Sequence, residues 1–315
     1  MKIVVLDGYT LNPGDLSWNE LKCLGEVKVY DRTSAEEVLD RIGDSEIIFT
    51  NKTVISKEVL ENCKNLKYIG VLAAGYNVVD IDYAKERGIV VTNTPGYSRK
   101  SVAQFVFALI LEVAHHVWDH NLKVKSGEWE KRRDFCFWDY PLIELEGKTL
   151  GIIGAGNIGK ENVPLAQAFG MNILIYDRFL NKDLEKYQVS LDNLLKDSDI
   201  ITFHCPLTKE TRNLIREDNI LKMKDKVILI NTSRGELAKE EDIYKYLENG
   251  KIGYYAADVA STEPILEDNI LLKAKNCIIT PHIAWAPKES RDRLLNIAIN
   301  NLKFYLSGEI INKVN

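Results

Sequence analysis

Short apolar runs alternate with amphipathic stretches along the first third of the chain. Ser34–Ile42 is typical of the amphipathic stretches, because Ser34 and Glu37 have the spacing of a capping box at a helix start. Strands that alternate with helices predict a parallel α/β sheet. The apolar runs that we predict to be its strands are Ile3–Asp7, Val27–Tyr30, Ile47–Asn51, Tyr68–Leu72 and Ile89–Thr92.

The pattern changes at Ser101. Residues from Ser101 to about Lys125 predict one long helix, in which Val102–Leu111 is apolar around most of the circumference. A helix of this kind must be buried, and we expect it to lie between domains or subunits.

A second α/β series begins at Thr149. Its strands and intervening helices match a complete doubly wound dinucleotide-binding domain. The last periodic stretch, Glu289 to Leu306, predicts one amphipathic helix that packs on the first domain. The predicted strands of the second series are Gly151–Ile153, Asn172–Tyr176, Ile200–His204, Val227–Asn231, Tyr254–Asp258 and Cys277–Thr280.

A glycine-rich turn follows the first strand of this series. Gly154, Gly156 and Gly159 have G-x-G-x-x-G spacing: the first allows a tight turn, the second lets a pyrophosphate approach, and the third lets the helix pack closely. Asp177 ends the next strand, where a carboxylate accepts hydrogen bonds from the ribose of NAD. The residues that we expect to bind NAD here are Gly154, Gly156, Asn157, Ile158, Gly159 and Asp177.

Composition narrows the class of protein. The 315 residues are 45% hydrophobic and 28% charged, which fits a globular protein of two domains. The net charge of −5 is mild, and no Lys/Arg cluster predicts nucleic-acid binding. No apolar run is long enough for a membrane span, and the chain starts directly in a strand. Five scattered cysteines show no metal-ligand spacing, so we expect reduced thiols, no metal and a cytoplasmic protein.

Polar residues at the carboxyl ends of the later strands are the candidates for catalysis, since open α/β sheets bind ligands there. Arg234 carries a planar donor fork suited to a carboxylate and a carbonyl oxygen. His282 is placed to exchange the proton that accompanies hydride transfer. Glu263, if bonded to the other ring nitrogen, fixes the tautomer of that imidazole and makes it a better base.

The whole chain resembles the D-2-hydroxyacid dehydrogenase family, and within it the glycerate dehydrogenase (hydroxypyruvate reductase) branch. Besides the glycine fingerprint, the motifs that carry the resemblance are Ala73-Ala74-Gly75-Tyr76-Asn77, Thr94-Pro95-Gly96-Tyr97-Ser98, Ser101-Val102-Ala103-Gln104, His204-Cys205-Pro206-Leu207-Thr208, Asn231-Thr232-Ser233-Arg234-Gly235, Asp258-Val259, Glu263-Pro264 and Thr280-Pro281-His282-Ile283-Ala284-Trp285. These motifs in this order are specific to the family.

The resemblance implies a fold and a set of site residues. It implies a discontinuous, flavodoxin-like substrate domain, residues 1–98 with 286–315, and a Rossmann domain over 99–285, with NAD and substrate in a cleft between them. Arg234, Glu263 and His282 are the implied catalytic residues. The resemblance also implies that backbone amides of Ala74 and Gly75 hold the substrate carboxylate, and that Arg234 touches the carboxylate and the keto oxygen together. His282 is implied to contact the substrate as well. The further residues implied at the cofactor are Cys205, Pro206, Thr232 and Asp258, the last contacting the nicotinamide carboxamide.

The aromatic segment from Phe135 to Pro141, together with Gly75-Tyr76-Asn77, is the main ground for assigning the branch. The segment belongs to an arm around residues 100–141 that we expect to form a homodimer. Two interpretations stay open: the arm packs on its partner, or Trp138 also reaches the active site of the neighbouring subunit.

The expected reaction is reversible hydride transfer between NADH and a short 2-oxoacid, with hydroxypyruvate reduced to D-glycerate. Alternatives within the class are a broad glyoxylate or 2-oxoacid reductase and a D-lactate dehydrogenase. A phosphoglycerate dehydrogenase is less favoured, because no basic phosphate motif is visible. An NAD-sensing binding module of corepressor type is the remote alternative.

Two residues depart from the simple pattern. Pro164 falls several residues inside the helix that follows the glycine turn, where proline removes a donor and is expected to kink the helix. Arg178, next to Asp177, partly offsets the repulsion that a carboxylate exerts on the 2′-phosphate of NADP. We therefore predict NAD as the cofactor, with incomplete discrimination.

Overall fold

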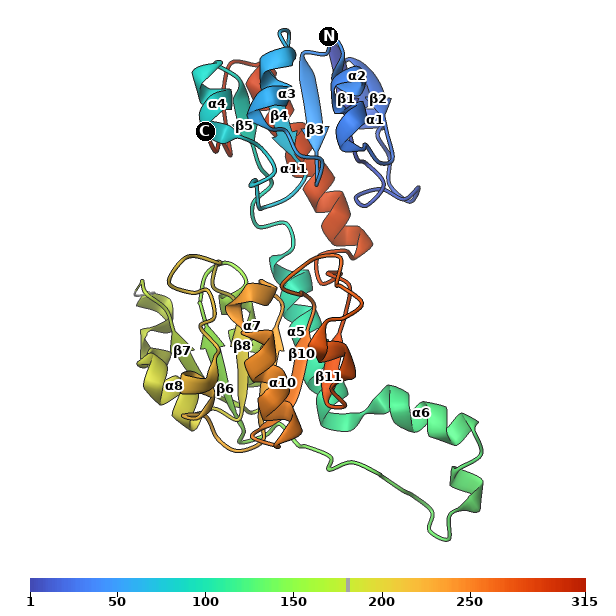
Figure 1. Ribbon diagram of the computed structural model, residues 1–315, viewed down its shortest axis with the longest axis vertical. Helices are drawn as coiled ribbons and strands as arrows, with labels where there is room; N and C mark the ends of the chain where they lie inside the picture. The colour runs from blue at the N-terminus through green and yellow to red at the C-terminus, as the bar shows by residue number, and fades with distance from the viewer. Residues whose placement is uncertain (180–181) are drawn as a thin grey trace. The chain divides into compact units, whose positions relative to one another are not determined.

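The computed structural model describes residues 1–179 and 182–315. The chain divides into two compact units, Met1–Ser98 with Trp285–Asn315, and Arg99–Ala284. Each unit holds a fully parallel sheet with helices around it (Figure 1). The predicted fold class, two parallel-sheet α/β domains, is confirmed.

The first unit has a five-stranded sheet in the order β2-β1-β3-β4-β5, the flavodoxin-like arrangement. Its strands are β1 (Lys2–Val5), β2 (Glu26–Val29), β3 (Ile47–Thr50), β4 (Tyr68–Val71) and β5 (Val90–Thr92). Its helices are α1 (Asn19–Lys22), α2 (Val38–Ile42), α3 (Lys57–Asn62), α4 (Ile81–Glu86) and α11 (Lys288–Leu306), with a 3₁₀ turn, η1 (Ala35–Glu37), before α2.

Alternation along the strands builds a core on each face of this sheet. Val4 and Ile48 face a core with α2, α3 and α4, whereas Ile3 and Phe49 face a core with α11. The predicted capping box is confirmed at the start of η1, where the Ser34 amide donates to Glu37 Oε2 (3.0 Å).

The second unit has a six-stranded sheet in the order β11-β10-β9-β8-β6-β7. Gln188 adds a single parallel bridge to Ile175 of β7, where the third strand of a complete dinucleotide fold would lie. The strand order reverses between β6 and β8, so ligands bind beyond the carboxyl ends of these two strands. The strands are β6 (Thr149–Ile153), β7 (Asn172–Tyr176), β8 (Ile200–Phe203), β9 (Val227–Asn231), β10 (Ile252–Ala257) and β11 (Cys277–Ile279).

Two groups of helices cover the two faces of this sheet. Helices α5 and α7 share a core with one face, and α8, α9 and α10 share a core with the other. The helices are α5 (Arg99–His115), α6 (Val117–Lys125), α7 (Asn162–Ala168), α8 (Leu191–Asp197), α9 (Glu217–Ile220) and α10 (Glu240–Glu248). The 3₁₀ turns are η2 (Trp129–Lys131), η3 (Gly159–Glu161), η4 (Lys182–Tyr187), η5 (Gly235–Leu237) and η6 (Ile270–Lys273).

The expectation of one long helix from Ser101 to about Lys125 is wrong. His116 adopts a left-handed conformation (φ 48°) and separates α5 from α6, which are bent by 52°. Only α5 is buried, whereas α6 and the segment after it extend away from the sheet (Figure 1). Among the described residues no single helix is long and apolar enough to cross a membrane; α5 and α6 satisfy those criteria of length and composition only when taken together.

Candidate active site

The glycine turn between β6 and η3 is closed by backbone contacts that leave no room for side chains at two positions. A Cβ on Gly154 (φ 92°) would lie 2.7 Å from the amide nitrogen of Cys205, and one on Gly159 would lie 1.9 Å from the carbonyl oxygen of Gly154. Gly156 is different, because a Cβ there would meet nothing within 4 Å. The turn is therefore packed from behind and open at its exposed tip, as a pyrophosphate cradle requires.

Asp177, directly after β7, holds the glycine turn against the end of β7. Its Oδ2 accepts a hydrogen bond from the amide of Ala155 (2.6 Å), and its Oδ1 accepts one from the amide of Phe179 (3.1 Å). The neighbouring Arg178 lies 3.9 Å from Glu210 in an exposed pair. The predicted acidic residue thus lies beside the glycine turn, with carboxylate lone pairs left for a ribose.

His204, at the end of β8, is held neutral beneath the turn. Its Nε2 lies 2.9 Å from Thr202 Oγ1 and 3.2 Å from Asn162 Nδ2. Burial lowers the pKa of this imidazole to about 3. Asn162 Nδ2 also donates to the carbonyl of Ile158 (3.1 Å), so the histidine and the turn share one buried amide.

Asn162 is a residue that our sequence reasoning missed. It is fully buried, and among the described residues its Oδ1 has no hydrogen-bond partner. The sequence signal that could have identified Asn162 is its position, since it is a polar residue at the start of the helix that follows the glycine fingerprint.

The expected kink at Pro164 is wrong. The residues after the fingerprint form the 3₁₀ turn η3, and α7 begins only at Asn162, so Pro164 is the third residue of that helix. An amide N–H in the first turn has no partner within an α-helix, and proline is tolerated there.

Arg234 is presented by a short turn after β9. Asn231 shapes the turn by donating from Nδ2 to the carbonyl of Arg234 (2.9 Å) and accepting at Oδ1 from Ser233 (3.1 Å). A Cβ on Gly235 would lie 2.0 Å from the carbonyl carbon of Ala260, so only glycine lets this turn approach the loop after β10. The exposed guanidinium donates from Nη1 to the carbonyl of Ser233 (2.6 Å).

Glu263 and His282 form a hydrogen-bonded pair, with 2.7 Å between Glu263 Oε2 and His282 Nδ1. Because a carboxylate accepts, Nδ1 carries the proton and Nε2 is the nitrogen left to exchange one. About a third of each side chain is exposed (34% for His282 and 37% for Glu263). His282 has φ 54°, a left-handed conformation that costs a non-glycine residue about 1 kcal/mol.

Asp258 holds the loop that carries His282. Its buried carboxylate accepts from Thr280 Oγ1 (2.6 Å) and from the amides of Ile283 (2.9 Å) and Ala284 (2.7 Å). These bonds stabilise the strained backbone of His282 from both sides. The predicted contact of Asp258 with the carboxamide of the cofactor stays a prediction.

The remaining predicted cofactor residues surround the same edge of the sheet. Burial raises the pKa of the Cys205 thiol, which fits packing rather than nucleophilic attack. Pro206 accepts from Thr211 Oγ1 (2.7 Å) at its carbonyl. Thr232 Oγ1 is buried and has no hydrogen-bond partner within the described part of the chain. An open glycine tip and an unpaired buried hydroxyl fit a bound dinucleotide.

Other predicted substrate residues belong to other parts of the chain. Ala74 and Gly75 belong to the first unit, in the loop after β4. Trp138 lies in the arm, with 61% of its surface exposed.

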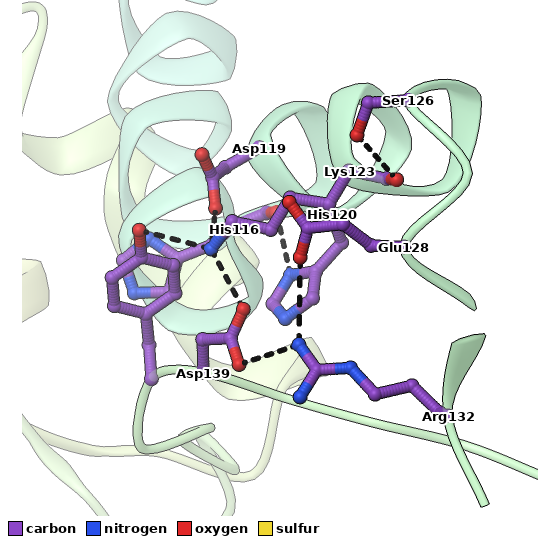
Figure 2. Close-up of polar contacts among 9 residues, drawn as sticks. His116, Asp119, His120, Lys123, Ser126, Glu128, Arg132 and Asp139 are labelled. Atoms are coloured by element: carbon purple, nitrogen blue, oxygen red, sulfur yellow. Dashed lines mark hydrogen bonds and ion pairs between the residues drawn. The ribbon is translucent and has the colours of Figure 1, made fainter.

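We define the arm as residues 117–142, which comprise α6 and the segment that follows it. Charged side chains hold that segment to α6 (Figure 2). Lys123 Nζ lies 2.9 Å from both Asp119 and Asp139, and Arg132 lies 3.4 Å from Asp139. These contacts leave large apolar side chains exposed along the arm: Val117, Trp118, Leu122, Val124, Trp129, Phe135, Trp138 and Leu142.

Comparisons with known proteins agree with this arrangement. Residues 107–284 match the family described as D-isomer specific 2-hydroxyacid dehydrogenase, NAD binding domain. A hydroxypyruvate reductase of Blautia hydrogenotrophica is 57% identical over the full length of both chains. A glycerate dehydrogenase of Methylorubrum extorquens is 37% identical over 99% of this chain and 98% of its own. A D-lactate dehydrogenase of Aquifex aeolicus, solved with NAD and lactic acid, is 32% identical with a TM-score of 0.82, covering 98% of this chain and 96% of its own.

Proposed function

The chain belongs to the D-isomer specific 2-hydroxyacid dehydrogenase family, and we propose that it reduces hydroxypyruvate to D-glycerate with NADH. It is an oxidoreductase that uses a nicotinamide dinucleotide. The observation that carries the proposal is the Glu263–His282 pair, because its 2.7 Å bond leaves Nε2 as the proton-exchanging atom. The hydroxypyruvate reductase that is 57% identical along its full length supports the choice of substrate.

The proposed division of labour follows from the chemistry of the three side chains. Arg234 binds the substrate carboxylate and polarises the keto oxygen through its donor fork. The nicotinamide, when bound, supplies the hydride that the keto carbon accepts. His282 donates the proton from Nε2 to the keto oxygen, and Glu263 stabilises the imidazolium before that transfer. In the reverse direction, His282 accepts the hydroxyl proton at the same atom.

Two parts of the chain bind the remaining groups in this proposal. The amides of Ala74 and Gly75 hold the substrate carboxylate with Arg234. The dinucleotide is held by Asp177 together with Gly154, Gly156, Asn157, Ile158, Gly159, Cys205, Pro206, Thr232 and Asp258.

We propose NAD rather than NADP as the cofactor. The Asp177 carboxylate beside the glycine turn repels a 2′-phosphate. Arg178 offsets this only in part, since it is exposed and paired at 3.9 Å with Glu210. In Asp177→Ala, we expect the ratio of kcat/KM for NADH over NADPH to fall at least about tenfold, equivalent to about 1.4 kcal/mol. An unchanged ratio contradicts the assignment of Asp177.

The substrate is tested by following NADH oxidation with hydroxypyruvate, glyoxylate, pyruvate and phosphohydroxypyruvate, and repeating each with NADPH. The proposal expects the highest kcat/KM with hydroxypyruvate and NADH. A higher value with glyoxylate or pyruvate overturns the substrate while keeping the family. Turnover of none of the four supports the sensor alternative.

We also propose that the enzyme works as a homodimer in the cytoplasm. The apolar side chains that the arm exposes in a single chain support a second copy as their partner. Both open interpretations of Trp138, packing on the partner and reaching its active site, require this dimer.

A further inference from the structure

In the loop after β4, two consecutive carbonyl groups contact the same neighbouring segment. The carbonyl of Ala73 accepts a hydrogen bond from the amide of Thr94 (3.0 Å), and the carbonyl of Ala74 accepts one from Asn93 Nδ2 (2.7 Å). In an extended strand, successive carbonyls point to opposite sides. Here both meet the residues that directly follow β5, so the backbone has left the extended conformation.

These two bonds fix the direction of two N–H groups. In a trans peptide the N–H points opposite to the carbonyl of the same plane, so the N–H groups of Ala74 and Gly75 both point away from Asn93 and Thr94. Successive N–H groups on one side form a nest that binds anions. In the part of the chain that the structure describes, neither of these two N–H groups donates a hydrogen bond.

The backbone of Asn93 is itself held by α11 and the segment that follows it. The Asn93 amide donates to the carbonyl of Asn312 (3.1 Å), and its carbonyl accepts from Asn301 Nδ2 (2.8 Å). Asn312 Nδ2 in turn donates to Oδ1 of the buried Asn301 (2.8 Å). Three asparagines thus connect the last helix to the carbonyl of Ala74.

We propose that Asn93 is a positioning residue that aims the N–H groups of Ala74 and Gly75 at the substrate carboxylate, and that Asn301 and Asn312 hold it in place. The inference rests on the proposed reduction of a 2-oxoacid and deepens it. Asn93 acts through the peptide plane and does not touch the substrate. An amide side chain suits the position, because a short donor is needed and an aspartate would set an anion against the Ala74 carbonyl.

The test compares steady-state kinetics of the wild type, Asn93→Ala and Asn93→Asp in the full chain. We expect Asn93→Ala to raise KM for hydroxypyruvate about 5- to 10-fold, as the loss of one net hydrogen bond implies, with kcat and KM for NADH within about twofold. Asn93→Asp raises KM further. Asn312→Ala gives a smaller rise in the same direction.

A merely structural role of Asn93 would give a different result. Its substitution would then lower the amount of folded enzyme, and so the apparent kcat, without changing KM. Asn62→Ala is the matched control, because Asn62 Nδ2 also donates to a backbone carbonyl (Glu58, 2.9 Å) in the same unit and is exposed. It should leave both constants unchanged.

The outcomes separate this inference from the proposed function. If the wild type reduces hydroxypyruvate and both Asn93 variants keep its KM, the inference is overturned and the function stands. If the wild type prefers glyoxylate, the same KM comparison is made with glyoxylate, since the carboxylate is shared. If the wild type reduces no 2-oxoacid, the proposed function fails and this inference fails with it.

Discussion

Two histidines, one after β8 and one after β11, have different surroundings, and these determine what each can do. His204 is half-buried against Thr202 and Asn162, and it stays neutral because desolvation of the ring lowers its pKa to about 3. His282 is partly exposed and bonded to Glu263, which leaves one ring nitrogen for proton exchange. The sequence places both histidines after strands, but it does not show the hydrogen-bond partners that distinguish them.

The lowered pKa of His204 predicts a pH dependence of stability. Its folded pKa is lowered, whereas in the unfolded chain it titrates near pH 6.5, so protons favour the unfolded state below that pH. The free energy of unfolding falls as pH drops from about 6.5 towards 3, with a slope of at most about 1.4 kcal/mol per pH unit from this residue. Urea unfolding between about pH 7.5 and about pH 5 measures the slope.

The variant His204→Gln should have a shallower slope than the wild type, because glutamine does not titrate. His115→Gln is the control: His115 is exposed, so the slope should match that of the wild type. Equal slopes in the wild type and His204→Gln contradict a neutral His204 in the folded protein.

Regular elements were predictable from the sequence where their pattern matched their burial. The six strands of the second unit are found where apolar runs predicted them, because a buried parallel strand is apolar on both faces. The break at His116 was not predictable, since helical periodicity continues past it and histidine does not signal a left-handed residue. The kink predicted at Pro164 was wrong for a related reason. The effect of a proline depends on its distance from the helix start, and the 3₁₀ turn η3 moves that start to Asn162.

The turn between β6 and η3 gives a prediction that separates folding from binding. Gly156 has room for a Cβ and no positive φ, so Gly156→Ala should fold with an unchanged melting temperature. The added methyl group lies where the pyrophosphate approaches, so the Kd for NADH should rise about tenfold or more. Fluorescence titration with NADH measures the Kd. Unchanged NADH affinity in the folded variant contradicts the placement of the dinucleotide.

For the molecule as a whole, the sequence indicates a dimer only through the resemblance, whereas the structure supplies a physical reason. Trp118, Trp129, Phe135 and Trp138 are all exposed on the arm of one chain. Large apolar side chains exposed together on one short segment favour a protein–protein interface there. The candidate catalytic residues could be located from the sequence because their motifs are local, but the hydrogen bonds of Asp258 to the His282 loop join residues that are not adjacent in the chain.

Sedimentation analysis should therefore give the mass of two chains. Trp138→Ala distinguishes the two interpretations of the arm. If Trp138 only packs on the partner, the dimer of the variant dissociates at a higher protein concentration than the wild-type dimer. If Trp138 also reaches the neighbouring active site, KM for hydroxypyruvate rises even when the dimer is intact. Leu272→Ala, an exposed apolar residue outside the arm, should change neither quantity. The mass of a single chain for the wild type contradicts the dimer.

The most direct test of the whole account is hydroxypyruvate reduction by His282→Ala at saturating NADH, with the wild type measured alongside. We expect kcat to fall by at least about 10²-fold, because the variant lacks a general acid, while the Kd for NADH stays unchanged. The wild type should yield D-glycerate. Near-normal turnover by the variant would remove His282, and with it the Glu263 pair, from the mechanism.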